Sequence, residues 1–380
     1  MKTLVKLAIV TILVTSCSSN KQPEDGLPFI DVNNNYPEKE ILLTDIADVT
    51  YLYLNSDDVD YLYSGSNLYI SKNTVVVIDG SSGSILFFHR DGTPKSRFNH
   101  SGQGPGEYLP RPNVIYDETA DELFVSNSRN VIQVYSSTGE YRRTINLPQE
   151  MLINGWISFD DRSLFIIDRR ADVEAEDYIG FGHISKTNGE ILNYVKLPRT
   201  HTFLGLNIDG NRVPPLTRRF AKCPGGVLLS SHGTDTIFLY SGDKSLTPVL
   251  YQTPSVTSLI PMEFLDNCLE MGQYQFINVI IVRPGKVYAG IFPTKNYIRD
   301  KKTGEIFRQK LIVPDYKEKE FIITPGYGSN GFENGYFFEL SLAELKEAYR
   351  AGKLSGQLKD LVATLDEDRD NNVFMLVEFK

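Results

Sequence analysis

The chain has 380 residues, of which 41% are hydrophobic and 23% are charged, an ordinary globular composition. Its formal net charge is -9 at pH 7. Because an acidic surface repels a phosphate backbone, we expect no nucleic-acid partner.

The N-terminus has the pattern of a signal peptide. Lys2 and Lys6 supply positive charge, an apolar segment follows over Leu7–Val14, and small residues precede Cys17. This apolar segment is too short to cross a bilayer as a helix, which favours a signal peptide over a transmembrane anchor. The residues Val14-Thr15-Ser16-Cys17 resemble a bacterial lipobox, which implies cleavage before Cys17 and its lipidation. The alternative is a plain secretory signal with a cysteine there by chance.

We therefore divide the chain into a lipoprotein signal peptide (1–16), a lipidated Cys17 with a flexible tether (17–36) and one folded domain (37–380). Acyl chains contribute about 0.8 kcal/mol per buried methylene, so several of them hold a domain on a membrane without embedding it. We expect a protein anchored by lipid to the outer membrane of the cell envelope. The sequence leaves open whether it faces the periplasm or the outside.

A turn that contains glycine recurs along the rest of the chain, after an apolar segment and before a more polar one. Its glycines are Gly92, Gly139, Gly189, Gly242 and Gly304, at intervals of 47, 50, 53 and 62 residues. Repeats of this length are typical of propeller blades, small antiparallel sheets that cannot bury their faces alone. The sequence therefore predicts an all-β fold, a six-bladed β-propeller with a short helical insertion in the last blade.

Short apolar segments between these turns predict the strands of five blades. A charged insertion over 169–178 interrupts the third blade. The predicted strands are 68–70, 75–78, 85–88 and one near Phe98; 123–126, 131–135 and 141–147; 164–168, 182–185 and 191–197; 226–230, 236–240 and 247–251; and 276–282, 287–292 and 306–310.

The sixth unit combines helices with a closing strand. Ser341 and Glu344 have the spacing of a capping box, which predicts a helix that begins there and stops at Gly352, followed by a second helix over 357–365. An open arc would expose two sheet edges. We therefore predict that the segment 41–54 joins the blade that contains the last strand, 373–379.

Three motifs resemble those of the six-bladed β-propeller lipoproteins of Gram-negative anaerobes, which are related in architecture to NHL-type propellers. They are the segments 102–108 (GQGPGEY), 234–238 (TDTIF) and 370–374 (DNNVF). The resemblance covers essentially the whole mature chain and implies the propeller fold and a cell-envelope location. It implies no catalytic residues. Asn372 stands where the family usually has proline.

The glycine-rich segment 102–108 is the first candidate binding element. Pro105 removes an amide donor and no amphipathic helix follows, so a nucleotide-binding loop is disfavoured. An ordinary connection between blades, with Tyr108 packed inward, is one interpretation. The other is a loop that borders the central pocket and binds ligand through five residues: His100, Gln103, Glu107, Tyr108 and Arg111.

No pattern in the sequence predicts a metal site or a cofactor. The acidic segment 366–370 lacks the glycine and glutamate of an EF-hand, which favours a solvated turn. The five histidines show no zinc-binding spacing, and no Gly-x-Ser-x-Gly motif occurs. Propeller active sites nevertheless take one residue from each blade and leave no linear motif.

The remaining cysteines and the aromatic residues have two interpretations each. Cys223 and Cys268 are either bridged in an oxidising compartment or, the favoured interpretation, separately buried as thiols. Most aromatic residues are expected in the core. Five that we expect in loops are candidates for stacking on a sugar or peptide: Tyr108, Phe203, Tyr274, Tyr297 and Tyr327.

The function that these features favour is a non-enzymatic binding module, anchored by lipid at the cell envelope, whose loop face binds a protein, a glycan or a peptide. The alternative is a propeller enzyme of the lactonase or lyase type, with a cation or an acid/base pair in its central channel. A purely structural scaffold in a lipoprotein complex is a third possibility.

Overall fold

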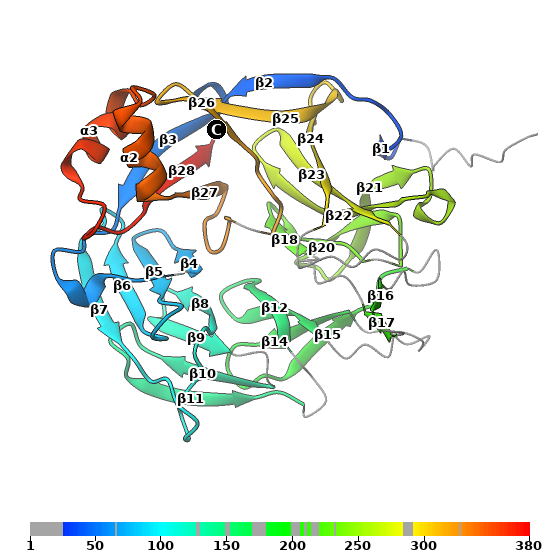
Figure 1. Cartoon of the computed structure of the whole chain (residues 1–380). Coiled ribbons are helices and arrows are strands. Elements are labelled where there is room, and N and C mark those ends of the chain that lie inside the picture. The colour runs from blue at the N-terminus through cyan, green and yellow to red at the C-terminus, as the bar shows by residue number, and fades with distance from the viewer. Residues whose placement is uncertain are drawn as a thin grey trace, which may run out of the picture.

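A computed structural model gives the fold, and six sheets stand in a ring around a central axis (Figure 1). The structure describes residues 26–64, 67–126, 130–148, 153–168, 180–198, 206–208, 211–213, 220–231, 233–283, 292–326 and 328–380. The predicted signal peptide, Cys17 and the insertion 169–178 lie outside these residues.

The first three blades follow one another along the chain, and each is a four-stranded antiparallel sheet whose first strand is innermost. Blade I comprises β4 (Asn67–Ile70), β5 (Thr74–Ile78), β6 (Ile85–His89) and β7 (Pro94–Phe98); blade II comprises β8 (Asn113–Asp117), β9 (Glu122–Ser126), β10 (Val131–Tyr135) and β11 (Tyr141–Asn146); and blade III comprises β12 (Ile153–Ser158), β13 (Ser163–Asp168), β14 (Phe181–Ser185) and β15 (Ile191–Val195).

Blades IV and V have the same core of four strands, and each gains a strand from the N-terminal segment. A small hairpin, β16 (Leu206–Ile208) with β17 (Asn211–Val213), precedes blade IV. Blade IV comprises β18 (Phe220–Cys223), β19 (Gly226–Leu229), β20 (Thr236–Ser241), β21 (Leu246–Thr253) and β1 (Phe29–Asp31); blade V comprises β22 (Met262–Met271), β23 (Tyr274–Val282), β24 (Thr294–Asp300), β25 (Ile306–Val313), β2 (Glu38–Leu42) and β26 (Tyr316–Phe321).

Blade VI joins the two ends of the chain, as predicted. It comprises β27 (Gly335–Leu340), β28 (Val373–Phe379) and β3 (Ala47–Tyr53). β3 pairs with β28 in antiparallel register from Tyr53 opposite Val373 to Ala47 opposite Phe379. The six-bladed propeller therefore closes through its N- and C-terminal strands, with the C-terminal β28 paired between β27 and β3 in one sheet.

The N-terminal segment differs from the prediction in two respects. The range 41–54 is not one strand: β2 ends at Leu42, the short helix α1 (Leu43–Ile46) follows, and only β3 enters blade VI. In addition, β1 pairs in parallel with β21 although its residues lie in the predicted tether 17–36. β1, β2 and β3 thus run along the outer strands of three successive blades (Figure 1).

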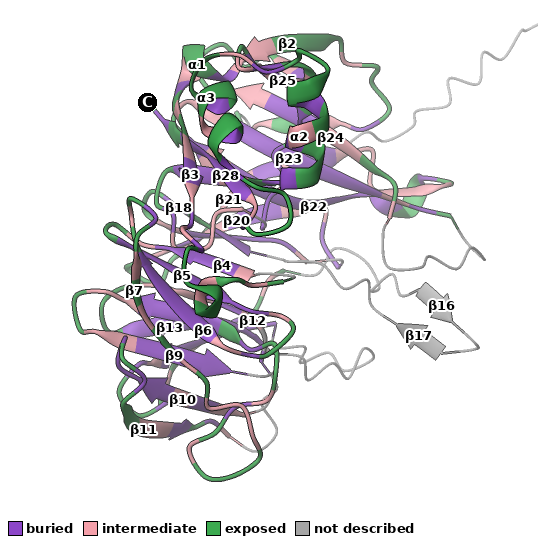
Figure 2. Ribbon diagram, turned by 60° about the vertical axis from the view of Figure 1, so that its left-hand side comes forward, coloured by how far each residue is buried: buried purple, intermediate pink, exposed green. Residues whose placement is uncertain are grey.

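Uninterrupted apolar strands arise because both faces of a blade are buried against its neighbours. In β5, Val75 and Val77 pack into the hydrophobic cluster shared with blade VI, whereas Val76 and Ile78 pack into the cluster shared with blade II. Successive side chains of a strand point to opposite faces. The core is therefore a set of layers between blades, visible as buried strands in Figure 2.

The recurring turns connect the third and fourth strands of their blades. Gly139 has φ +85°, and a Cβ there would lie 2.6 Å from Cγ of Phe98 in blade I, so the turn packs against the preceding blade. In the fourth blade the left-handed position belongs to Lys244, with φ 67°, rather than to the predicted Gly242. The turn of the fourth blade thus has its left-handed residue two positions after the glycine.

The predicted strand 287–292 of blade V lies almost entirely outside the described residues. The third strand of that blade is β24, which pairs with β23 and β25. It begins at Thr294, just beyond the predicted range. Tyr297, expected in a loop, is buried in this strand, and Tyr274 is in β23, so both expectations were wrong.

The helical insertion lies between β27 and β28 and comprises α2 (Leu342–Arg350) and α3 (Gly356–Thr364). The predicted capping box does not form, because the side chain of Ser341 makes no capping hydrogen bond. Instead, the backbone N–H of Leu342 donates to Oδ1 of Asn372 at 2.9 Å. Among the described residues, no helix has the length and apolar character needed to cross a membrane.

Candidate binding site at the propeller axis

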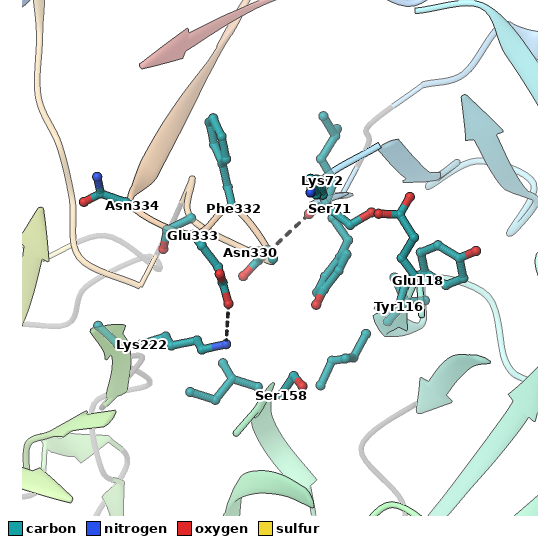
Figure 3. Close-up of a pocket in the computed structure, with 18 of the residues that line it drawn as sticks. Ser71, Lys72, Tyr116, Glu118, Ser158, Lys222, Asn330, Phe332, Glu333 and Asn334 are labelled. Atoms are coloured by element: carbon teal, nitrogen blue, oxygen red, sulfur yellow. Dashed lines mark hydrogen bonds and ion pairs between the residues drawn. The ribbon is translucent and has the colours of Figure 1, made fainter. Parts of the chain in front are cut away.

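A cavity of about 1310 Å³ lies at the axis of the ring, and all six blades contribute residues to its lining. Its wall is formed by the inner strands and by the turns that follow them, such as Ser71-Lys72, Glu118-Thr119 and Phe159–Asp161. Figure 3 shows residues from several blades around this common space. We call it the axial cavity.

Polar residues gather here because the inner strands of blades I to V end in tight turns that cannot join the apolar layers. Lys72 and Glu118 occupy equivalent turns of neighbouring blades, and both lie in the lining. Oε1 of Glu118 accepts a hydrogen bond from Oγ1 of Thr74 at 2.5 Å, and its Oε2 accepts one from the backbone N–H of Asn73 at 3.0 Å. This carboxylate is thus held by the turn of blade I.

A glycine-rich loop before β27 also borders the axial cavity. Asn330 lies in this loop, and its carbonyl accepts a hydrogen bond from the N–H of Ile70 at 2.9 Å. Gly331 has φ +71°, and a Cβ there would lie 2.5 Å from the ring of Tyr69. Only glycine allows the loop to approach blade I so closely.

The same loop is linked to blade IV by an ion pair. Nζ of Lys222, on β18, lies 2.9 Å from Oε1 of Glu333, and both side chains are solvent-exposed (Figure 3). Such an exposed pair contributes roughly 0–1 kcal/mol. Its main effect is on the charge of the lining, because each partner neutralises the other.

A second ion pair in the lining is largely buried. Nζ of Lys186 lies 2.8 Å from Oδ2 of Asp117, with side-chain exposures of 7% and 13%. Burial opposes ionisation of Asp117, but the hydrogen bond and the charge of Lys186 lower the pKa of this carboxyl below its ordinary value. The pair connects blades II and III beside the axial cavity.

A hydrogen-bond chain runs from the axial cavity into the layer between blades III and IV. Oγ of Ser163 lies 2.6 Å from Oδ1 of Asp160 and 2.7 Å from Nε2 of His183. Nδ1 of His183 lies 3.3 Å from the hydroxyl of Tyr240, which accepts a hydrogen bond from Nδ2 of Asn193. Burial lowers the pKa of His183, which favours its neutral form.

The five residues predicted to bind ligand lie together at the junction of blades I and II. They are not among the described residues that line the axial cavity. Tyr108 is buried; its hydroxyl donates to the carbonyl of Gly83 at 3.1 Å and accepts from the N–H of His100. Nε2 of His100 lies 2.8 Å from the carbonyl oxygen of Gly139 in blade II.

The other three residues have different environments. Oε2 of Glu107 accepts a hydrogen bond from the N–H of Gly104 at 2.7 Å, and Nε of Arg111 donates to the carbonyl of Gly80 at 3.0 Å. Gln103 is exposed. His100, Glu107, Tyr108 and Arg111 therefore all take part in holding the connection between the blades. Ligand binding by the five residues stays a prediction.

The other candidate residues are placed as follows. Cys223 and Cys268 are unbridged and buried in the layer between blades IV and V, as favoured from the sequence. The acidic segment 366–370 is a turn between α3 and β28 in which Oδ1 of Asp370 accepts a hydrogen bond from the hydroxyl of Tyr53. Phe203 and Tyr327 lie outside the described residues. In the described ranges, no group of three or more His, Cys, Asp or Glu side chains is placed to hold a metal ion.

The residues of the axial cavity were not identified from the sequence. Four of them are isolated charged residues in the sequence, and each is more than 60 positions from the next: Lys72, Asp161, Lys222 and Glu333. The available signal was positional for two of them: Lys72 and Asp161 follow the first strands of their blades, whereas Lys222 lies within β18 and Glu333 precedes β27. Once the blades are aligned on their glycine turns, this position can be found in the sequence.

The fold and this cavity define the molecule as a six-bladed β-propeller with an axial cavity lined by polar and apolar residues. Its sequence matches the model of DUF4934, a domain of unknown function, over residues 27–378. The chain belongs to this family. A comparison with curated proteins finds no match.

Two solved structures are similar to the chain. One is a protein of Bacteroides fragilis NCTC 9343, designated an exported protein, with a TM-score of 0.62 and 15% sequence identity over 90% of this chain and 98% of its own. The other is a member of the DUF4221 family from Bacteroides vulgatus ATCC 8482, with a TM-score of 0.45 and 11% identity over 88% of this chain and 97% of its own. The first of these supports the fold assignment.

Proposed function

We propose that this protein is a ligand-binding module of the cell envelope, anchored by lipid at Cys17, and that the axial cavity is its binding site. The observation that carries the proposal is the convergence of polar residues from all six blades on one cavity of about 1310 Å³. Typical small-molecule pockets have about 300–1,000 Å³. The axial cavity is larger, and it suits an oligomeric ligand such as a glycan or a peptide.

Two further observations support the envelope location. The N-terminal segment has the charge, length and small residues of a lipoprotein signal. The similar structure from Bacteroides fragilis is designated an exported protein. An extracytoplasmic binding module fits both observations.

The experiment is a thermal-shift screen of the folded domain against oligosaccharides, peptides and envelope proteins. A ligand at 100 times its Kd stabilises the native state by about 2.7 kcal/mol, which raises the melting temperature measurably. Two variants narrow the cavity: Ser158→Trp on β12 and Asp161→Trp on the exposed turn after it. Gln103→Ala, in the connection between blades I and II, is the matched control.

We expect each cavity variant that retains a native melting profile to lose the ligand-induced shift, and Gln103→Ala to keep it. Loss of the shift in Gln103→Ala alone would assign the binding site to the connection between blades I and II. Turnover of a bound lactone or glycan, followed by product analysis, would favour the enzyme alternative. A scaffold would co-purify with envelope proteins whose binding the cavity variants leave unchanged.

A further inference from the structure

We infer that the axial cavity takes an uncharged, hydroxyl-rich oligomer, that is, a neutral oligosaccharide. This inference rests on the proposed function and specifies the chemical class of its ligand. It depends on how the charged side chains of the lining are paired with one another.

The four cationic side chains and eight carboxylates of the described lining suggest at first an acidic site. Most of these charges are compensated within the protein. Four carboxylates have cationic partners within 3.2 Å: Asp117 with Lys186, Glu333 with Lys222, Glu378 with Arg90, and Glu270 with Lys301.

Three further carboxylates accept hydrogen bonds from neighbouring hydroxyl and backbone groups. Glu118 is held by the turn of blade I, as described above. Oδ1 of Asp160 accepts from the N–H of Arg162 at 2.8 Å in addition to its contact with Ser163. Oδ1 of Asp91 accepts from the N–H and the hydroxyl of Thr93 at 2.9 and 2.7 Å. These carboxylates remain charged, but their turns already solvate them.

Two lining residues remain without such a contact in the described structure, Lys72 and Asp161. Both are exposed, and they carry opposite charges on the turns of blades I and III. They therefore give the cavity no excess of either sign. In the described lining every cation except Lys72 is paired, and every carboxylate without a cationic partner except Asp161 is hydrogen-bonded by its own or a neighbouring turn. A charged ligand therefore finds no cluster of unengaged charges there.

A hydroxyl group fits this arrangement better than a charged group does. It both donates and accepts, so it can accept from Nζ of Lys222 and donate to Oε1 of Glu333 without separating the pair. Hydrogen bonds to ionised partners are roughly twice as strong as those between neutral groups. A charged ligand would instead have to displace one partner of an ion pair and leave the other unpaired. This is costly for the largely buried pair of Lys186 and Asp117.

The rest of the lining offers groups of the same kind. Ser71, Ser158 and Asn330 contribute hydroxyl and amide groups to the lining, whereas the amide of Asn334 is bound to backbone groups of Phe379 and Gly272 (Figure 3). Neutral donors and acceptors distributed around a large cavity match an oligomer that carries hydroxyl groups along its whole length. A single small polar molecule would leave most of these groups unused.

The test uses calorimetric titration of the folded domain with pairs of oligomers that differ in charge. Each neutral oligosaccharide is compared with a charged counterpart: chitin hexamer with chitosan hexamer, and methyl-esterified oligogalacturonate with the free acid. Neutral gluco-, manno- and xylo-oligosaccharides and short peptides complete the set. All titrations are repeated at 50 and 500 mM NaCl, because salt screens interactions between charges.

We expect a neutral oligosaccharide to bind with a Kd that changes less than threefold between the two salt concentrations, and Ser158→Trp and Asp161→Trp to abolish its binding. Binding of charged oligomers or peptides alone, abolished by the same variants, would overturn this inference and leave the proposed function intact. Binding that neither variant affects would remove the proposed function. A folded domain that binds no member of the set would count against the inference.

Variants of the exposed ion pair provide a second test. Lys222→Met leaves Glu333 unpaired, and we expect it to gain about fivefold in affinity for chitosan hexamer at 50 mM NaCl, as one exposed charge contact provides. Glu333→Gln should gain similarly for the free oligogalacturonate, and the double variant should lose both gains. Unchanged affinities in both single variants would show that this pair does not set the charge of the cavity.

Discussion

The imidazole of His183 is the titratable group whose environment most clearly links the interior to the axial cavity. Because Ser163 donates its only hydroxyl proton to Asp160, Nε2 of the ring donates to Ser163, and Nδ1 of the neutral ring accepts from the hydroxyl of Tyr240. This assignment follows from the order of donors along the chain, and it requires a neutral ring.

Acid should therefore destabilise the fold through His183. Burial lowers its pKa, so the unfolded chain binds a proton below pH 6.5, the ordinary value, while the folded protein still does not. Stability is retained above that pH and is lost as the pH falls from about 6.5 toward the lowered pKa. Protonation would also break the bond donated by Tyr240.

We expect the melting temperature of the wild type to fall between pH 7 and pH 5, and that of His183→Gln to fall less over the same interval. The variant should be less stable at pH 7, because it cannot reproduce both hydrogen bonds of the ring. Parallel melting curves for the two proteins across this interval would exclude His183 as the source of the pH dependence.

At the scale of single elements, the turns between third and fourth strands decide how tightly the blades stack. Gly92, Gly139 and Gly189 have positive φ, and a Cβ at any of them would collide with the neighbouring blade. Gly304 also has positive φ, but nothing lies within 4 Å of a Cβ there. One turn type thus has two packing environments.

These environments predict different costs for the same substitution. Gly304→Ala should reduce the free energy of unfolding by about 1–2 kcal/mol, the cost of the left-handed conformation for alanine. Gly139→Ala should cost about 1–3 kcal/mol more, because its methyl group must displace Phe98. Urea denaturation of both variants measures the difference, and equal losses would contradict the steric explanation.

Asn372 shows how one residue can change an element far away in the sequence. Its Oδ1 caps α2 by accepting from the N–H of Leu342, and its Nδ2 donates to Oε1 of Glu339 at 2.7 Å. Asn371, beside it, is buried and donates to the carbonyl oxygens of Leu54 and Tyr61. The motif therefore connects the last strand both to the helical insertion and to the segment that follows β3.

At the scale of the whole molecule, the closed ring incorporates the N-terminal segment, which bears on the proposed lipid anchor. β1, β2 and β3 pair with three blades, and the first described residues, 26–28, precede β1 at the outer edge of blade IV. Because the strands after this point are tied into the ring, changing Cys17 should alter attachment without altering the fold.

We predict that the wild type fractionates with membranes and is released by detergent, and that Cys17→Ala is soluble with an unchanged melting temperature. Cys223→Ala is the control, since it removes a cysteine and leaves the lipobox intact; it should remain with the membranes. Membrane association of Cys17→Ala equal to that of the wild type would contradict the lipid anchor.

The sequence by itself determined the number of blades, most strand positions and the closure by both ends, because these depend on local patterns. Apolar segments, glycine turns and the last strand repeat at a readable interval. It misplaced features that depend on distant contacts, such as the pairing of β1 with β21 and the cap of α2 by Asn372.

Only the tertiary structure decided where the candidate site lies. Residues such as Lys222 and Glu333 are 111 positions apart and become partners because the ring brings the ends of all inner strands to one axis. The residues predicted around Tyr108 instead form hydrogen bonds that hold the connection between blades I and II. Local patterns specify each blade, whereas a cavity shared by six blades exists only after the ring has closed.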